Sequence, residues 1–502
     1  MTDLKLLYLG MWSKPDRKIL FAATNFWFLE TFSLPAKPTT ADEFISNVHD
    51  CASNAIKEDH VNFLSTLGTR LKLADPHHSA ILKGMATVAL FVFFGKLMSA
   101  AKEMVVAYRY GLGAEVDAYQ FLYNLISWPI GVWGSVLTAV LVPLAARIRQ
   151  FDKEELPRFR SELFGLALLL GPALAMLAWL SIWTMLELGR SGLQGSSAQL
   201  ATEALPGLVF LLPLGLLIAL QSAWMLSTGR HVNTLLDCIP TFFIGAAILV
   251  FPGGGIEPLV WGTVAGCGCH LCALLVPMAR RSEIEAPSFT QVSPQWQWFW
   301  HGFGIMLAGQ ALMSLTVIID QFYAASLGAG SIATLGYANR ILSLILGLAA
   351  IAVARATLPV FSQSRPEGAG ELHNVVKYWT CLMFMGGILV MLIGYILAPW
   401  AVKLLFERGQ FTASDTRIVA DVLRYGLPQL PFYFSCMVLV SYALSQRRYK
   451  LIFWTGVIGF VGKISGNVLL VPYFGINGIA FGAIFVYGFN ALFFCIALLY
   501  KK

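Results

Sequence analysis

Two stretches of the chain share one pattern: LLPLGLLIALQSAWMLSTGR at residues 211–230 and QLPFYFSCMVLVSYALSQRR at residues 429–448. Each contains an early Leu-Pro step, continues as an apolar run without charges, and ends in Leu-Ser followed by basic residues. An α-helix needs about 20 apolar residues to cross about 30 Å of hydrocarbon. The pattern therefore predicts a membrane-spanning helix that occurs twice in one fold.

The duplication extends to both sides of these stretches. The sequence GIEPLVWG at residues 255–262 recurs as GINGIAFG at residues 475–482, and Gly113 has a counterpart in Gly330. With six predicted spans in each copy, both copies begin on the same side of the membrane and form a parallel repeat. Two repeated bundles with a substrate site between them are typical of transporters.

The composition agrees with a membrane protein. Of 502 residues, 57% are hydrophobic and 13% are charged, whereas soluble domains contain about 25% charged residues. This excludes a cytosolic enzyme, a disordered chain and a secreted disulfide scaffold. We predict an all-α polytopic membrane protein with two six-helix lobes. Its twelve spans are expected near residues 83–110, 117–147, 162–187, 204–228, 232–251, 257–279, 297–326, 331–361, 374–402, 417–445, 450–472 and 476–499.

The charges outside the spans predict the orientation of the chain. Basic residues gather in alternate connections, such as residues 147–160 and 447–450. On the opposite side, no Lys or Arg occurs at residues 111–116, 252–256, 327–330 and 473–475. Because cytoplasmic loops carry the excess of Lys and Arg, both termini are expected in the cytoplasm. The net charge of +7 is then explained by topology, and a nucleic-acid partner is not expected.

The chain is expected to divide into four parts. Residues 1–81 carry mixed charges and predict a cytoplasmic N-terminal extension. Residues 82–281 form the first predicted lobe, residues 282–296 a cytoplasmic linker, and residues 297–502 the second lobe.

The cysteines do not suggest a disulfide framework, because seven of the eight lie in apolar runs. The group Cys267, Cys269, His270 and Cys272 permits two interpretations, a metal site or close helix packing by small residues. We expect packing, because these residues spread around a helix. No metal and no other cofactor are expected, and the sequence lacks the glycine-rich phosphate loop of nucleotide-driven pumps.

Several charges nevertheless lie inside predicted spans, where each costs about 2.5–3.5 kcal/mol on insertion scales. They are Lys96, Lys102, Glu103, Asp117, Asp320, Arg340, Arg355 and Lys463. One interpretation is a set of ion pairs that hold the two lobes together. The other is a cationic cavity for an anionic headgroup, because the basic side chains outnumber the carboxylates; Arg suits bidentate phosphate contacts, and Lys acts as a point charge.

Three segments resemble the MurJ/MviN family of lipid-linked oligosaccharide flippases, which belongs to the multidrug/oligosaccharidyl-lipid/polysaccharide exporter superfamily. They are FGKLM at residues 94–98, YGLGA at residues 110–114 and LFERGQFTASD at residues 405–415. The similarity extends over about residues 85–500. The third segment is the most specific of the three.

The resemblance implies a transporter that moves a polyprenyl-pyrophosphate-linked saccharide across the bacterial cytoplasmic membrane by alternating access. Lipid II and a unit of the exopolysaccharide or O-antigen type are the two candidates, and the second is favoured because lysines stand where the family has two arginines. Membrane lipids and polysaccharide assembly proteins are the candidate partners. The substrate-binding residues that the resemblance implies are Lys96, Lys102, Asp117 and Arg340, and the pattern of intramembrane charges adds Glu103 and Arg355 as candidates.

A second set of residues concerns ion coupling. Some relatives bind sodium through a carboxylate and polar groups, and Asp320 and Asn467 resemble those ligands. Lys463 lies one helical turn before Asn467, so an Asp320–Lys463 ion pair is expected in place of a sodium site.

Three other functions compete with that of a flippase. A cation-coupled multidrug exporter of the same superfamily would favour an apolar cavity with a single carboxylate. A membrane-embedded glycosyltransferase needs catalytic acids in larger outer loops, and a purely structural role does not explain the intramembrane charges. The basic residues favour an anionic substrate.

Overall fold

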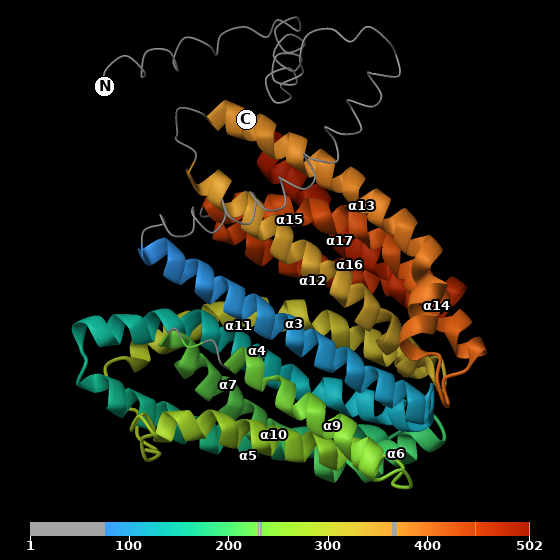
Figure 1. Cartoon of the computed structure of the whole chain (residues 1–502), viewed down its shortest axis with the longest axis horizontal. Helices are drawn as coiled ribbons and strands as arrows, with labels where there is room; N and C mark the ends of the chain where they lie inside the picture. Colours follow the sequence, from blue (N-terminus) through green and yellow to red (C-terminus); the bar gives the residue numbers. More distant parts are fainter. Residues whose placement is uncertain (1–75, 229, 231–232, 364–368, 447, 501–502) are drawn as a thin grey trace, which may run out of the picture. The chain divides into compact units, whose positions relative to one another are not determined.

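The computed structural model describes residues 76–228, 230, 233–363, 369–446 and 448–500 (Figure 1). The chain divides into two units, Met1–Thr87 and Val88–Lys502, and the contacts given below belong to the second. Most of the predicted extension, residues 1–75, lies outside the described residues.

Every regular element in the described part of the chain is a helix. The helices are α3 (Pro76–Tyr110), α4 (Ala114–Phe151), α5 (Glu155–Glu187), α6 (Ser196–Leu208), α7 (Leu211–Ser227), α8 (Asn233–Leu236), α9 (Cys238–Val250), α10 (Glu257–Ala279), α11 (Trp296–Ser326), α12 (Ser331–Gln363), α13 (Ala369–Phe406), α14 (Ala413–Gly426), η2 (Leu427–Gln429), α15 (Leu430–Ser445), α16 (Tyr449–Phe474), α17 (Ile476–Phe494) and η3 (Cys495–Tyr500).

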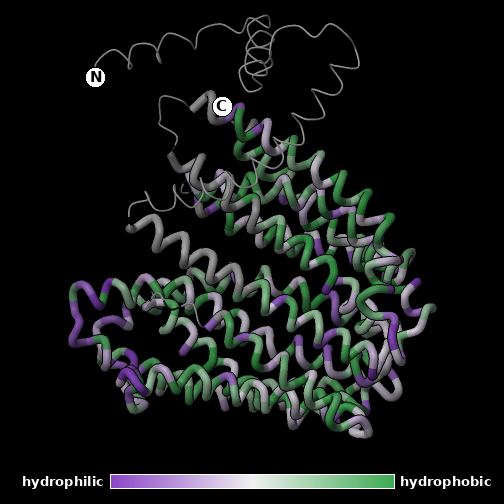
Figure 2. Tube along the Cα trace, in the orientation of Figure 1, coloured by the Kyte–Doolittle hydropathy of each residue, from purple (hydrophilic) through white to green (hydrophobic). Residues whose placement is uncertain are grey.

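The predicted all-α membrane fold is confirmed. Among the described residues, nine helical segments are long and apolar enough to cross a membrane, or ten if the bent pair α6–α7 is one span. Figure 2 shows hydrophobic residues along the helices and hydrophilic ones gathered at the turn between α4 and α5. The remaining two predicted spans coincide with α3 and with α9, which is shorter. The count of twelve stays a prediction.

The fourth predicted span is broken one turn before a proline. The axes of α6 and α7 differ by 49°, and the break at residues 209–210 precedes Pro213 by one turn. Proline has no N–H to bond the carbonyl four residues earlier, and its ring crowds that carbonyl. In the second copy, η2 interrupts the equivalent span between α14 and α15, next to Pro428 and Pro431. The Leu-Pro steps thus lie at matching breaks.

The helices pack as two groups. In the first group (α4–α10), α4 packs on α6 and α7, and α9 packs on α10; in the second group (α11–α17), α16 packs on α17 and α13 on α15. The groups meet where α4 packs on α11 and α12. Helix α3 contacts both, since Gly95 approaches Cys238 and the Tyr108 carbonyl accepts a hydrogen bond from the N–H of Gln410.

Two loops make related contacts, one from the first helix group to α11 and one from the second helix group to α3. Gly192 lies against Ala325 at the end of α11, and Gly409 lies against the Tyr108 carbonyl at the end of α3. Both glycines have positive φ, 79° and 59°, and a Cβ built on Gly409 would stand 2.2 Å from the Tyr108 oxygen. Gly409 follows Gly192 by 217 residues, and Ala325 follows Tyr108 by the same interval. The predicted repeat therefore relates the two contacts.

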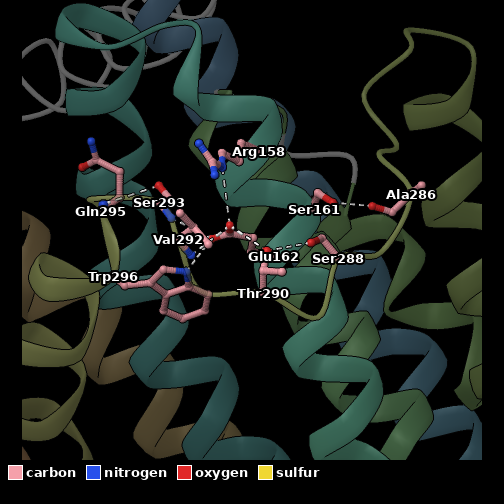
Figure 3. A network of polar contacts seen from close by, with 10 residues as sticks. All are labelled: Arg158, Ser161, Glu162, Ala286, Ser288, Thr290, Val292, Ser293, Gln295 and Trp296. Carbon is pink, nitrogen blue, oxygen red and sulfur yellow. Dashed lines mark hydrogen bonds and ion pairs between the residues drawn. The ribbon is translucent and has the colours of Figure 1, made fainter.

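The segment between α10 and α11 has no helix but is fixed to α5 (Figure 3). The buried carboxylate of Glu162 accepts hydrogen bonds from the N–H groups of Val292 and Ser293, at 3.1 and 3.2 Å, and from the indole N–H of Trp296 at 2.6 Å. The hydroxyl of Thr290 donates another at 3.1 Å. Because a buried carboxylate is stable only when its oxygens are bonded, this network anchors the predicted linker and the start of α11.

Candidate functional site

One cluster of charges joins α3 to α12. The Lys102 ammonium lies 2.6 Å from Glu103 Oε1, and Arg340 Nε lies 3.0 Å from the same oxygen. The Glu103 side chain is 5% exposed, whereas that of Arg340 is 47% exposed. Two cations share one carboxylate, so the cluster retains a net positive charge. The exposed guanidinium keeps donors for a further anion.

A second cluster lies within the second helix group. Lys463 on α16 places its ammonium 2.8 Å from Asp320 Oδ2 on α11 and donates to the Ile479 carbonyl at 3.0 Å. Asn467 donates from its amide to Asp320 Oδ1 at 2.9 Å. Here one cation meets one carboxylate, and the cluster is neutral.

Asp117 lies at the junction of the two helix groups. Its buried carboxylate accepts hydrogen bonds from the N–H of Gly330 and, at 2.7 Å, from the N–H of Ala333, at the start of α12. The first N–H groups of a helix have no partner within it and favour a negative charge. Nearby, the Tyr337 hydroxyl donates to the Gly111 carbonyl at 3.2 Å. Asp117 therefore fastens α4 to α12 on the side where the two glycine loops lie.

The other predicted binding residues lie apart from these contacts. Lys96 is exposed on α3, and no ion pair or hydrogen bond joins it to another described residue. Arg355 belongs to α12, but its side chain lies outside the described part of the structure.

A cavity of about 360 Å³ lies beside both clusters. It is lined from α4, α11, α12, η2, α16 and α17. Arg340 from the first cluster and Asp320 and Lys463 from the second all reach its wall. The structure thus brings charges from three separate predicted spans to one internal space.

The family model described as "Lipid II flippase MurJ" matches residues 82–502. This chain belongs to the MurJ family. The match covers all of the described charge clusters, and family membership makes the protein a membrane transporter rather than an enzyme.

Curated relatives extend the same result. The protein described as "Probable lipid II flippase MurJ" of Buchnera aphidicola subsp. Baizongia pistaciae is 22% identical over 411 residues, which cover 78% of this chain and 79% of the relative. A protein of the same description from Helicobacter pylori strain J99 is 31% identical over 189 residues, which cover 36% of this chain and 40% of the relative. The second alignment spans less than half of that relative.

Solved structures agree on the fold. The structure described as "Lipid II flippase MurJ, inward closed conformation" has a TM-score of 0.72 at 19% identity and covers 82% of this chain and 87% of its own. An inward-facing multidrug resistance MATE family transporter of the MOP superfamily has a TM-score of 0.63 at 17% identity, covering 81% and 93%. At these identities the likeness shows the fold alone, which MurJ and MATE proteins share.

The residues around His270 do not form a metal centre in the part of the chain that the structure describes. No group of three or more His, Cys, Asp or Glu side chains there could hold a metal ion. His270 is buried, and its Nε2 lies 3.7 Å from Asp237 Oδ1. Cys269 and Cys272 are exposed.

Sequence reasoning missed the uncharged polar side chains of the cavity. Gln120, Asn124, Gln321 and Asn339 all line it. A signal was present, because Gln120 and Asn124 are four residues apart in an apolar helix and so share a face.

Proposed function

We propose that this protein flips a polyprenyl-pyrophosphate-linked saccharide from the cytoplasmic to the outer leaflet of the bacterial cytoplasmic membrane. One observation carries the proposal: Lys102 and Arg340 share a single carboxylate, and Arg340 faces an internal cavity with nearly half of its side chain exposed. Maintaining a surplus cation inside a membrane protein is costly unless an anion arrives to meet it.

A pyrophosphate fits this arrangement. Arg presents a planar fork of N–H donors that suits two phosphate oxygens, and Lys adds a point charge nearby. Glu103 holds both cations in place by its contacts to Lys102 and Arg340. Because Glu103 neutralises one of the two charges, the site attracts an anion without binding it too firmly to release it.

The fold supports alternating access between two helix groups. Asp117 and the Gly192 loop fasten the two groups together, and the Gly409 loop fastens the second group to the end of α3. The charge distribution of the loops predicts that this end faces outward. A state closed there and open to the cytoplasm would load the substrate from the inner leaflet, and breaking these contacts would release it outside.

Two classes of lipid-linked saccharide carry the pyrophosphate that this site would bind. The relatives are described as probable lipid II flippases, and a lipid-linked unit of the exopolysaccharide or O-antigen type carries the same pyrophosphate. Comparing both substrates in one assay distinguishes them.

The test is transport by the full chain in proteoliposomes that contain a labelled lipid-linked saccharide. We expect the wild type to move the label between leaflets and Arg340→Ala and Lys102→Ala each to reduce the rate at least about ten-fold, since a hydrogen bond to a charged group is worth about 1.5–3 kcal/mol. Lys403→Ala is the matched control, because Lys403 forms only an exposed pair with Glu407. Full activity of both cavity variants would overturn the proposal.

A further inference from the structure

Four carboxamide side chains surround the internal cavity. Gln120 and Asn124 reach it from α4, Gln321 from α11 and Asn339 from α12. None of the four forms a side-chain hydrogen bond with any residue that the structure describes. Gln429, a fifth carboxamide in the wall, differs, because its amide donates to the Gly426 carbonyl at 2.6 Å.

Two of the free carboxamides are nearly inaccessible. Gln120 is 7% exposed and Gln321 is 6% exposed, and Gln321 Oε1 is a buried acceptor without a partner. The Gln120 amide lies over Gly336, where a Cβ would stand 2.2 Å from its Oε1. Buried polar side chains nearly always have a hydrogen-bond partner. Two such side chains without one, next to the more accessible Asn124 and Asn339 in the same wall, point to a ligand that supplies the partners.

The side chains that line the cavity indicate which functional groups that ligand carries. A carboxamide is uncharged and offers both donors and an acceptor, which matches hydroxyl and acetamido groups, whereas an anion would leave the carboxamide oxygen without a donor. Two of the charges in the wall, Asp320 and Lys463, are already paired with each other. Tyr487 adds an aromatic ring to the same wall, and the volume of about 360 Å³ falls within the about 300–1,000 Å³ of small-molecule sites.

Arg340 determines how the substrate would be oriented in the cavity. It is the residue of the positively charged cluster that also lines the cavity, so a phosphate on Arg340 has its attached group beside the carboxamides. We propose that this cavity is a carbohydrate subsite, in which Gln120, Asn124, Gln321 and Asn339 bind the hydroxyl and acetamido groups of the first sugars while the pyrophosphate lies on Arg340. This inference rests on the proposed function. It adds a site for the saccharide, which the charged residues do not bind.

The test compares two probes on the purified full chain in lipid nanodiscs. One probe is a polyprenyl pyrophosphate that carries an N-acetylated disaccharide, and the other is the same polyprenyl pyrophosphate without sugar. For Asn124→Leu and Gln321→Leu we expect affinity for the sugar-bearing probe to fall about ten-fold or more and affinity for the bare probe to change less than about two-fold, because only the first probe loses hydrogen bonds.

Two control variants make the result specific. Asn490→Leu removes a buried carboxamide of α17 whose Oδ1 also has no partner among the described residues, but which does not line the cavity; it should leave both affinities unchanged. Arg340→Ala should weaken both probes alike. Thermal unfolding of each variant shows whether it is folded.

The outcomes separate the two proposals. If the wild type binds neither probe, the proposed function fails. If the wild type binds the sugar-bearing probe but no more tightly than the bare one, the carbohydrate subsite is overturned and the flippase proposal stands. Equal weakening of both probes by Asn124→Leu and Gln321→Leu, or no weakening of either, overturns the subsite as well.

Discussion

The two charge clusters differ although their carboxylates lie at equivalent places. Asp320 follows Glu103 by 217 residues, the interval that relates the two glycine loops. Glu103 on α3 meets Lys102 and Arg340, and thereby joins α3 to the second helix group. Asp320 on α11 meets Lys463 and Asn467 and stays within that group.

The surroundings of each cluster indicate its task. The first has a surplus cation and a half-exposed arginine, so it can accept an anion without a large rearrangement. The second is neutral, and the Lys463 side chain is only 5% exposed. We propose that the closed neutral network contributes to structure and that the open cationic one contributes to binding. Under this proposal, the carboxylates at equivalent positions of the predicted repeat serve two different uses.

The largest effect is expected from breaking the closed cluster. Lys463→Met leaves the Asp320 carboxylate without its cation, and loss of one partner of a buried pair costs about 3–5 kcal/mol. The free energy of unfolding in detergent should fall by this amount. The double variant Asp320→Leu/Lys463→Met should recover most of it, because a buried ion pair can be replaced by apolar residues with little loss. A loss below about 1 kcal/mol in the single variant would mean that Lys463 is solvated, contrary to the comparison.

In the cluster of Lys102, Glu103 and Arg340, loss of a cation should lower substrate affinity more than stability. Arg340→Ala is expected to reduce substrate affinity about 10- to 100-fold with a smaller effect on stability, because Lys102 remains 2.6 Å from Glu103. Arg340→Lys keeps the charge without the planar fork and should give an intermediate affinity. Binding titrations and unfolding curves on the same preparations provide the measurement. If Arg340→Ala destabilises the protein as much as Lys463→Met, the functional contrast between the clusters is lost.

A smaller effect is expected at the contact that closes the two groups. Asp117→Ala removes the acceptor at the start of α12, and loss of a helix cap costs about 0.5–2 kcal/mol. The population open at this end should rise by up to about 30-fold. Spin labels on Gln194 and Ser414, which are exposed and lie near the two glycine loops, report the separation of the groups. An unchanged distance distribution would show that the loops alone keep this end closed.

The sequence predicted the helices well because their length and apolar character follow from the membrane. The predicted limits 257–279 coincide with α10, and the predicted span 331–361 lies within α12. The span at 204–228 was expected as one helix but is two, α6 and α7, since only the three-dimensional path reveals whether a proline bends a helix or breaks it.

The candidate site was predicted unevenly for a physical reason. Charges inside spans are rare and costly, so Glu103, Arg340 and Lys463 were recognisable at once. The carboxamides were not, because an uncharged Gln or Asn in a span is common enough to escape notice. The partners of Asp117 depend on how α4 meets α12, and no local pattern in the sequence specifies that contact.

The last prediction is that sodium has no effect on transport by the wild type. It tests whether Lys463 of the closed cluster occupies the place of a bound cation. The Lys463 ammonium already lies within 3.0 Å of Asp320 Oδ2 and the Ile479 carbonyl, and a sodium ion would have to enter beside a fixed positive charge. Transport by the wild type should therefore be the same in sodium as in an equal concentration of choline. Lys463→Ala removes the ammonium and leaves the Asp320 carboxylate, the Ile479 carbonyl and the unpartnered Asn467 Oδ1, which are oxygen ligands of the kind that hard cations prefer. This variant should be more stable, and transport faster, in sodium than in choline. A sodium-dependent wild type would instead show that the cation site survives beside Lys463.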